Sequence, residues 1–258
     1  FMIVSGIMII ALCIVMFAVD EAKLSLEMKE YENAHPEENL AQTDSESGEE
    51  KLPKDVKCSL AFLLCSIALW FIAYNGVETW FTTYAAKMWG MSLGGASMCL
   101  TIATGGAIVS YIPVAQLASK IGRRRTIQSG VLLLASCFIV AFVYTMLSDM
   151  FHSWLYVVFF FVGLAWAAIN VNSLPMVLEM CKGSEVGKFT GLYYTFSMTA
   201  QIITPILAGF LLKHVGYRTL FPYAAIFSFA AFCTMLMVKH GDTKVEAKRG
   251  LEAFDIED

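Results

Sequence analysis

Residues 58–85, CSLAFLLCSIALWFIAYNGVETWFTTYA, form an apolar run that contains a single charged side chain, Glu78. An α-helix of about 20 apolar residues is long enough to cross the hydrocarbon core of a bilayer. The run is continuous and does not alternate between apolar and polar residues, as the strands of a membrane β-barrel do. It therefore predicts a transmembrane helix.

Six further runs of the same kind occur along the chain, and the charged residues gather between them. The chain has 258 residues, of which 57% are apolar and 16% charged, whereas soluble domains have about 45–50% and about 25%. The sequence thus predicts an all-α polytopic membrane protein and excludes a soluble enzyme. A net charge of −4 gives none of the basic surface that a nucleic-acid-binding protein needs. The six runs are 1–19, 93–116, 126–147, 154–178, 188–212 and 219–238.

The seven cysteines lie mostly within the apolar runs, and no pair has the spacing of metal ligands. We interpret them as small apolar packing residues. The sequence contains no Gly-rich phosphate-binding loop, which argues against ATP-driven transport. It also lacks a nucleophile–base or metal constellation that would indicate an enzyme. We therefore expect no cofactor, no bound metal and no enzymatic activity.

The first two runs are separated by residues 20–57, a polar segment that includes the acidic stretch HPEENLAQTDSESGEEKLPKD at 35–55. Such a segment cannot bury enough apolar surface to fold alone, so we expect a flexible linker. Fifteen of the 18 Lys and Arg residues fall on one face of the membrane, the exceptions being Lys87, Lys213 and Arg218. Because basic loops remain in the cytoplasm, the linker and the 239–258 tail are predicted to be cytoplasmic in a multi-pass plasma-membrane protein.

A short basic loop, AQLASKIGRRRTI at 115–127, follows the third run. It resembles the second-half copy of the loop motif of the major facilitator superfamily, Gly-x-x-x-Asp-Arg-x-Gly-Arg-Arg. The usual Gly and Asp are replaced by Ala115 and Ser119. A glycine permits the tight turn, and basic residues anchor helix ends at the lipid–water boundary. Anchoring of this kind, without any role in transport, is the simpler interpretation of the arginines. The residues that correspond to the motif are Lys120, Gly122, Arg123 and Arg124.

This resemblance implies a twelve-helix transporter in which two six-helix halves surround a site near the middle of the membrane. Residues 1–19 would be the sixth helix, 20–57 the central cytoplasmic loop, and 58–238 the six helices of the C-terminal half. The N-terminal half would then be a required partner that this sequence does not contain, and the chain would be a fragment of the transporter.

Three segments resemble the sugar–cation symporters of the sucrose-transporter and glycoside–pentoside–hexuronide type. The resemblance implies a sugar substrate, such as an oligosaccharide or a glucoside, and a proton or a sodium ion as the coupling cation. The segments are WFIAYNGVETWFTTYA (70–85), GLAWAAINVNSLPMVLEM (163–180) and GLYYTFSMTAQIITPILAGFL (191–211).

The first of these segments places aromatic and polar side chains on one predicted helix face. Trp70, Tyr74 and Glu78 follow one another at intervals of four, and Asn75 precedes Glu78 by three. Aromatic rings can stack on a sugar while a carboxylate and an amide bind its hydroxyls, so all four are predicted to bind substrate. Glu78, the only carboxylate well inside the six later runs, is also the candidate for cation coupling. The alternative is a glutamate near the outer end of its helix that reaches water.

The second segment contributes Trp166, Asn170 and Asn172 as predicted substrate-binding residues. Trp166 and Asn170 are four residues apart, and Asn172 lies shortly before Pro175. A proline inside a helix frees backbone carbonyls that polar neighbours must satisfy in a membrane. The two asparagines therefore have a structural interpretation as well as a substrate-binding one.

The third segment carries a polar stripe at helical intervals. Such a stripe facing lipid would be costly, so it is predicted to face protein or a pore. Gln201, near the middle of the helix, and Tyr194 are the predicted substrate contacts, and hydrogen bonding between helices is the alternative. The stripe consists of Thr190, Tyr194, Ser197, Gln201 and Thr204.

We therefore expect a secondary active transporter that moves a sugar together with a proton or a sodium ion by alternating access. Two alternatives remain: drug or metabolite efflux on the same fold, and a seven-span receptor or non-transporting scaffold. The polar candidate residues argue against an efflux site, which would be more apolar. The acidic gap after the first run and the Gly-Arg-Arg loop argue against a receptor.

Overall fold

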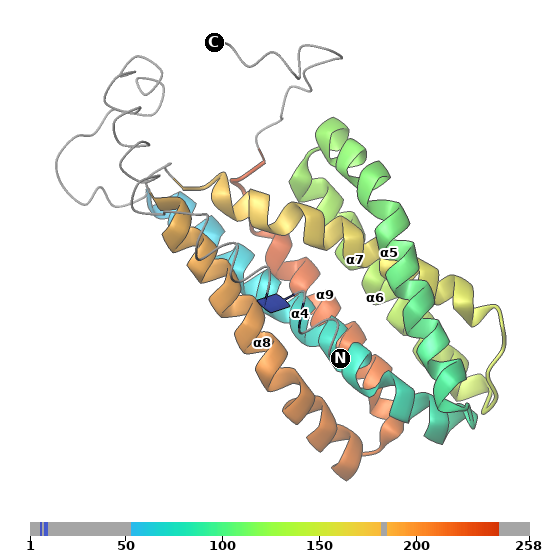
Figure 1. The fold of residues 1–258 in the computed structure, drawn as a ribbon. Helices are drawn as coiled ribbons and strands as arrows, with labels where there is room; N and C mark the ends of the chain where they lie inside the picture. The colour runs from blue at the N-terminus through green and yellow to red at the C-terminus, as the bar shows by residue number, and fades with distance from the viewer. Residues whose placement is uncertain (1–5, 7, 10–52, 182–184, 243–258) are drawn as a thin grey trace. The chain divides into compact units, whose positions relative to one another are not determined.

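The computed structural model describes residues 53–181 and 185–242, together with Gly6, Met8 and Ile9 (Figure 1). Contacts divide the chain into two units, Phe1–Lys51 and Leu52–Asp258. Everything described below belongs to the second unit. The predicted first span, 1–19, and the linker up to residue 52 lie almost entirely outside the described residues.

Six long helices build the second unit, and no strand occurs in the part of the chain that is described. All six are long and apolar enough to cross a membrane, the last of them together with the short helix that precedes it, as the span Tyr217–Leu236. The predicted all-α polytopic membrane fold is therefore confirmed. The helices are α4 (Lys54–Trp89), α5 (Leu93–Ile121), α6 (Arg123–Leu147), α7 (Leu155–Leu178), α8 (Val186–His214) and α9 (Leu220–Leu236), with the short 3-10 helix η2 (Tyr217–Thr219) before α9.

Several helices extend beyond the apolar runs that predicted them. α4 begins at Lys54, inside the segment assigned to the linker, and continues to Trp89. Hydropathy marks only the apolar part of a helix, whereas backbone hydrogen bonding continues until the chain is capped. Gly90, in the left-handed conformation at φ 62°, ends α4 and donates its N–H to the Ala85 carbonyl. The linker prediction was therefore too long at its C-terminal end.

The bundle consists of two equivalent triplets of helices, the first formed by α4, α5 and α6 and the second by α7, α8 and α9. α5 and α6 pack on α7, just as α8 and α9 pack on α4, and α6 packs on α9 (Figure 1). This pattern is unchanged when α4, α5 and α6 are exchanged with α7, α8 and α9. Successive spans cross the membrane in alternating directions, and equivalent helices are three positions apart in the chain, so the two triplets run in opposite directions through the membrane.

Glycines let helices of different triplets approach one another closely. A Cβ atom added to Gly163 of α7 would overlap the backbone carbonyl of Ala103 in α5. A Cβ on Gly106 would lie 2.7 Å from the backbone oxygen of Phe160. Backbone atoms cannot move aside as a flexible side chain can, so these contacts fix the spacing of α5 and α7.

We expect Gly163→Ala to destabilise the bundle by about 1–3 kcal/mol, because its methyl group must displace the α5 backbone. Gly105→Ala is the matched control, since no atom lies within 4 Å of a Cβ at that position of α5. The helix propensity of alanine alone favours the control variant by about 1 kcal/mol. Thermal unfolding of the detergent-purified protein measures both effects, and equal melting temperatures for the two variants would contradict the proposed close contact.

An aromatic cluster joins α4 and α9 to the rest of the bundle near the C-terminal end of α4. Phe221 of α9 lies edge-on to Tyr84, with ring centroids 4.9 Å apart, and also contacts Trp89. The Tyr84 hydroxyl makes a 2.6 Å hydrogen bond to Thr145 of α6. The core therefore lies among α4, α6, α7 and α9, while α5 and α8 are the least buried helices.

Candidate functional site

A pair of stacked aromatic rings bridges α4 and α7, which otherwise barely touch. The rings of Tyr74 and Trp166 are almost parallel, with an interplanar angle of 8° and centroids 3.9 Å apart. Phe71 packs edge-on against Trp166 at 5.2 Å. Tyr74 and Trp166 are both partly exposed, so the stack offers an aromatic surface at the junction of the two triplets.

Polar groups from three helices surround this stack. Glu78 is exposed one helical turn beyond Tyr74, and Asn170 is partly exposed one turn beyond Trp166. Glu78 and Tyr111 of α5 lie within electrostatic range of the Tyr74 phenol. We call Tyr74, Glu78, Tyr111, Trp166 and Asn170 the α4–α7 site.

The side chain of Asn75, a predicted substrate contact, is hydrogen-bonded to its own helix. Its amide nitrogen donates a 2.9 Å hydrogen bond to the Phe71 carbonyl one turn earlier. Side chain to backbone bonding of this kind satisfies an amide inside a membrane helix without any partner outside it. Asn75 therefore adjoins the α4–α7 site and supports its helix there.

Trp70 does not belong to the α4–α7 site, because none of its side chain is exposed. Its indole N–H has no hydrogen-bond partner in the described part of the chain. Each step of four residues advances about 40° around a helix of 3.6 residues per turn. From Trp70 to Glu78 this drift is large enough to turn the first residue into the core and the last to the surface. Trp70 therefore lies in the core of this structure, and its role as a substrate contact stays a prediction.

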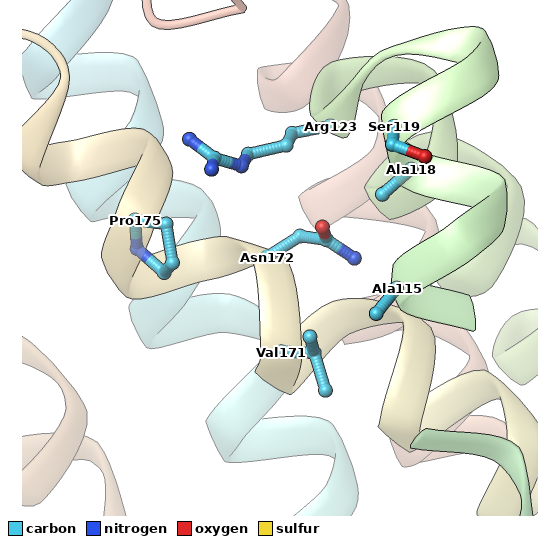
Figure 2. A pocket seen from close by; sticks show the side chains of 7 residues that line it. All are labelled: Ala115, Ala118, Ser119, Arg123, Val171, Asn172 and Pro175. Carbon is cyan, nitrogen blue, oxygen red and sulfur yellow. The ribbon is translucent and has the colours of Figure 1, made fainter. Parts of the chain in front are cut away.

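The two asparagines of α7 lie in different surroundings. Asn172 is 2% exposed, and its amide nitrogen donates a 2.8 Å hydrogen bond to the Ala168 carbonyl. It lines a pocket together with Ser119 and Arg123 (Figure 2). Residues two apart on a helix point about 160° away from each other, so Asn170 and Asn172 cannot serve the same site.

The polar stripe of α8 is divided between the interior and the surface. Ser197 and Thr204 are buried and donate hydrogen bonds to backbone carbonyls of their own helix. Tyr194 and Gln201 are exposed. None of the described contacts joins Tyr194 or Gln201 to the α4–α7 site, so their role as substrate contacts stays a prediction.

Tyr193 and Tyr111 are two aromatic residues that sequence reasoning did not identify. The buried hydroxyl of Tyr193 lies 3.1 Å from that of Ser173 and so links α8 to α7. Tyr111 is the single aromatic residue of α5, and that isolation was the one signal in the sequence that could have identified it.

A charged cluster forms where α5 ends and α6 begins. Arg123 forms an ion pair with Glu179 just beyond α7, and the two side chains are 24% and 17% exposed. The Asp242 carboxylate accepts a 3.3 Å hydrogen bond from the backbone N–H of Arg124. At Gly122, φ is 95° and a Cβ would lie 2.7 Å from the same carboxylate, so both conformation and space require glycine. We call Arg123, Glu179 and Asp242 the α6 charge cluster.

The loop residues predicted from sequence differ in their surroundings. Arg124 donates a 3.0 Å hydrogen bond to the Leu236 carbonyl near the end of α9. Lys120 is exposed. The chain after α9 contacts the same end of the bundle, where Ser59 of α4 bonds to His240 at 2.8 Å. The first residues of the predicted tail are thus packed against the helices.

No metal site is present among the described residues 53–181 and 185–242, where no three His, Cys, Asp or Glu side chains come together to hold an ion. The cysteines described there are free thiols. Cys99 and Cys137 are buried, whereas Cys58, Cys65 and Cys233 are exposed on helices that are apolar enough to face lipid.

Comparison with known proteins identifies the class of this bundle. The family model of the Major Facilitator Superfamily matches residues 1–148 and again residues 85–256. The chain belongs to the major facilitator superfamily. Its members are membrane transporters rather than enzymes, which agrees with the six apolar helices. No curated protein matches the chain.

Proposed function

We propose that this major facilitator protein is a secondary active transporter that moves a sugar together with a proton or a sodium ion. The observation that supports the proposal is the stacked pair of Tyr74 and Trp166 beside the exposed carboxylate of Glu78. The receptor or scaffold alternative loses its support because the family consists of transporters.

The α4–α7 site has the chemistry that sugar recognition requires. A pyranose presents C–H groups on its faces and hydroxyl groups around its rim. An indole and a phenol ring supply a large amphipathic surface for the faces, while Glu78, Asn170 and Tyr111 offer hydrogen-bonding groups for the rim. A drug-efflux site would need fewer such polar groups.

Glu78 is the proposed coupling residue. A charged carboxylate inside a membrane is costly, and binding of a proton or a sodium ion removes that cost. A site loaded with both cation and sugar can then change conformation more readily than a site loaded with sugar alone. This difference couples the transport of the sugar to the transport of the cation.

The α6 charge cluster is the proposed gate at the cytoplasmic end. The Arg123–Glu179 ion pair holds the start of α6 against the end of α7, and opening of that end requires the pair to separate. We also propose that the protein lies in the plasma membrane with the linker and the C-terminus in the cytoplasm. A second six-helix half closes the α4–α7 site from the opposite side in this proposed transporter.

Replacement of Trp166 by leucine tests the binding surface. We expect KM for the transported sugar to rise about tenfold, because an aromatic contact contributes about 0.5–1.5 kcal/mol beyond its buried area and 1.4 kcal/mol is a factor of about ten. Trp154→Leu is the matched control, since Trp154 lies at the start of the same helix and packs on Tyr144. Initial rates of sugar uptake by proteoliposomes measure the effect. Equal KM values for the two variants would contradict a role for the stacked pair.

A further inference from the structure

A cavity of about 290 Å³ lies between α5 and α7, next to the start of α6 (Figure 2). Its residues overlap with the α6 charge cluster only at Arg123, and none of them belongs to the α4–α7 site. Small side chains on α5 leave the space that the cavity occupies. The lining residues are Ala115, Ala118, Ser119, Arg123, Val171, Asn172 and Pro175.

The hydrogen-bond ladder of α7 is interrupted beside this cavity, at Pro175. Pro175 has no N–H, so the carbonyl of Val171 four residues earlier has lost its usual helical partner. Both residues line the cavity. In a membrane protein such a freed carbonyl is tolerated where a polar group or a water-filled space can satisfy it.

Two side chains add further polar groups. Asn172 is 2% exposed, and Figure 2 shows it reaching from α7 toward α5 beneath Arg123. Its bond to the Ala168 carbonyl uses the amide nitrogen, so the amide oxygen remains as an acceptor. The Ser119 hydroxyl donates to the Gln116 carbonyl at 2.8 Å and keeps its lone pairs as acceptors.

Arg123 supplies donors without making the cavity strongly charged. Its guanidinium carries five N–H donors, and its charge is compensated by the ion pair with Glu179. A bound anion would have to compete with Glu179, and a bound cation would lie beside Arg123. A neutral ligand with several hydroxyl groups matches this mixture of donors and acceptors best.

We propose that this cavity is a second solute subsite, which holds one neutral polyol the size of a pyranose ring. The inference rests on the proposed sugar transport and extends it to a position nearer the cytoplasmic gate. The volume lies at the lower limit of ligand pockets, roughly 300–1,000 Å³, so a monosaccharide fits better than a larger sugar. A solute in this subsite would accept hydrogen bonds from the Arg123 guanidinium, which also forms the ion pair with Glu179.

Protection of an introduced cysteine tests the subsite. Ala115→Cys places a thiol in the cavity wall, and Gln116→Cys places an exposed thiol on the next residue of α5, outside the lining. The full-length protein in nanodiscs is alkylated with N-ethylmaleimide, with and without methyl α-D-glucopyranoside, and each site is quantified by peptide mass spectrometry. We expect the sugar at about nine times its Kd to slow alkylation at position 115 about tenfold and to leave position 116 unchanged.

Two further variants separate local occupancy from an indirect effect. Protection of the thiol introduced by Ala115→Cys should persist with Trp166→Leu, which alters only the α4–α7 site, and should disappear with Asn172→Leu, which removes the amide acceptor. A thermal melt confirms that each variant is folded. Protection that is lost with Trp166→Leu would mean that the signal comes from the α4–α7 site and would overturn the subsite. Protection that survives Asn172→Leu would overturn it as well.

Uptake of the same sugar, measured on the same preparation, distinguishes this inference from the proposed function. Uptake without protection at position 115 overturns the subsite and leaves the proposed function in place. Protection without uptake supports the subsite and contradicts sugar transport. If neither uptake nor protection occurs, both proposals are overturned.

Discussion

Replacement of Glu78 by glutamine is expected to abolish gradient-driven accumulation of the sugar while sugar exchange across the membrane continues. Glutamine has nearly the shape of a protonated glutamate and keeps hydrogen-bonding groups for the sugar, but it cannot take up or release a cation. With one-to-one coupling, a gradient of one pH unit, worth 1.36 kcal/mol, sustains about a tenfold accumulation in the wild type. The variant should reach only the external concentration.

Radiolabelled sugar in proteoliposomes measures this prediction under an imposed proton or sodium gradient. Thr79→Ala is the control, because Thr79 is the exposed neighbour of Glu78 on α4. A counterflow assay shows that the Glu78→Gln protein is folded and still binds sugar. Full accumulation by Glu78→Gln would remove Glu78 from coupling and return it to the role of a residue that reaches water from its helix.

Reversal of the Arg123 charge is expected to lower the uptake rate strongly. Arg123→Glu places two carboxylates together in a partly buried position, where Arg123 and Glu179 are 24% and 17% exposed. Loss of a fully buried ion pair costs about 3–5 kcal/mol, and solvent exposure reduces that figure here to about 2 kcal/mol. A shift of this size changes the balance between closed and open states about 30-fold, so the uptake rate should fall by an order of magnitude.

A double exchange tests whether the pair itself is responsible. Arg123→Glu combined with Glu179→Arg restores opposite charges and should recover much of the uptake rate that each single variant loses. Initial rates for the wild type, both single variants and the double variant complete the cycle. If the double variant is no faster than the single ones, the ion pair does not act as the proposed gate.

The fold could be predicted from the sequence because its strongest signal is local. An apolar run such as 93–116 indicates a membrane helix without knowledge of its neighbours. The ends of the helices could be predicted less well, because they depend on capping. Gly122 illustrates this limit: the loop motif includes it, but its contact with Asp242 depends on a residue distant in sequence.

The candidate site was predictable only in part, because its geometry depends on helices packing together. Tyr74 and Trp166 were each identified from their own helices, but nothing in the sequence indicates that their rings stack. Trp70 was placed on the same face as Glu78, whereas it is buried in the core. The direction of a side chain turns by about 40° around the helix with each four-residue step. Glu179 and Asp242 were missed because contacts between distant segments, such as the ion pair of Glu179 and the hydrogen bond of Asp242, leave no periodic pattern in the chain.

Uptake of radiolabelled sucrose, maltose and methyl α-D-glucopyranoside by proteoliposomes containing the full-length protein tests the central claim most directly. Each sugar is measured without a gradient, with a proton gradient and with a sodium gradient. The account predicts that at least one sugar accumulates above its external concentration under one of the two gradients and only equilibrates without it. Absence of accumulation for every sugar under both gradients would contradict sugar symport and would favour drug or metabolite efflux on the same fold.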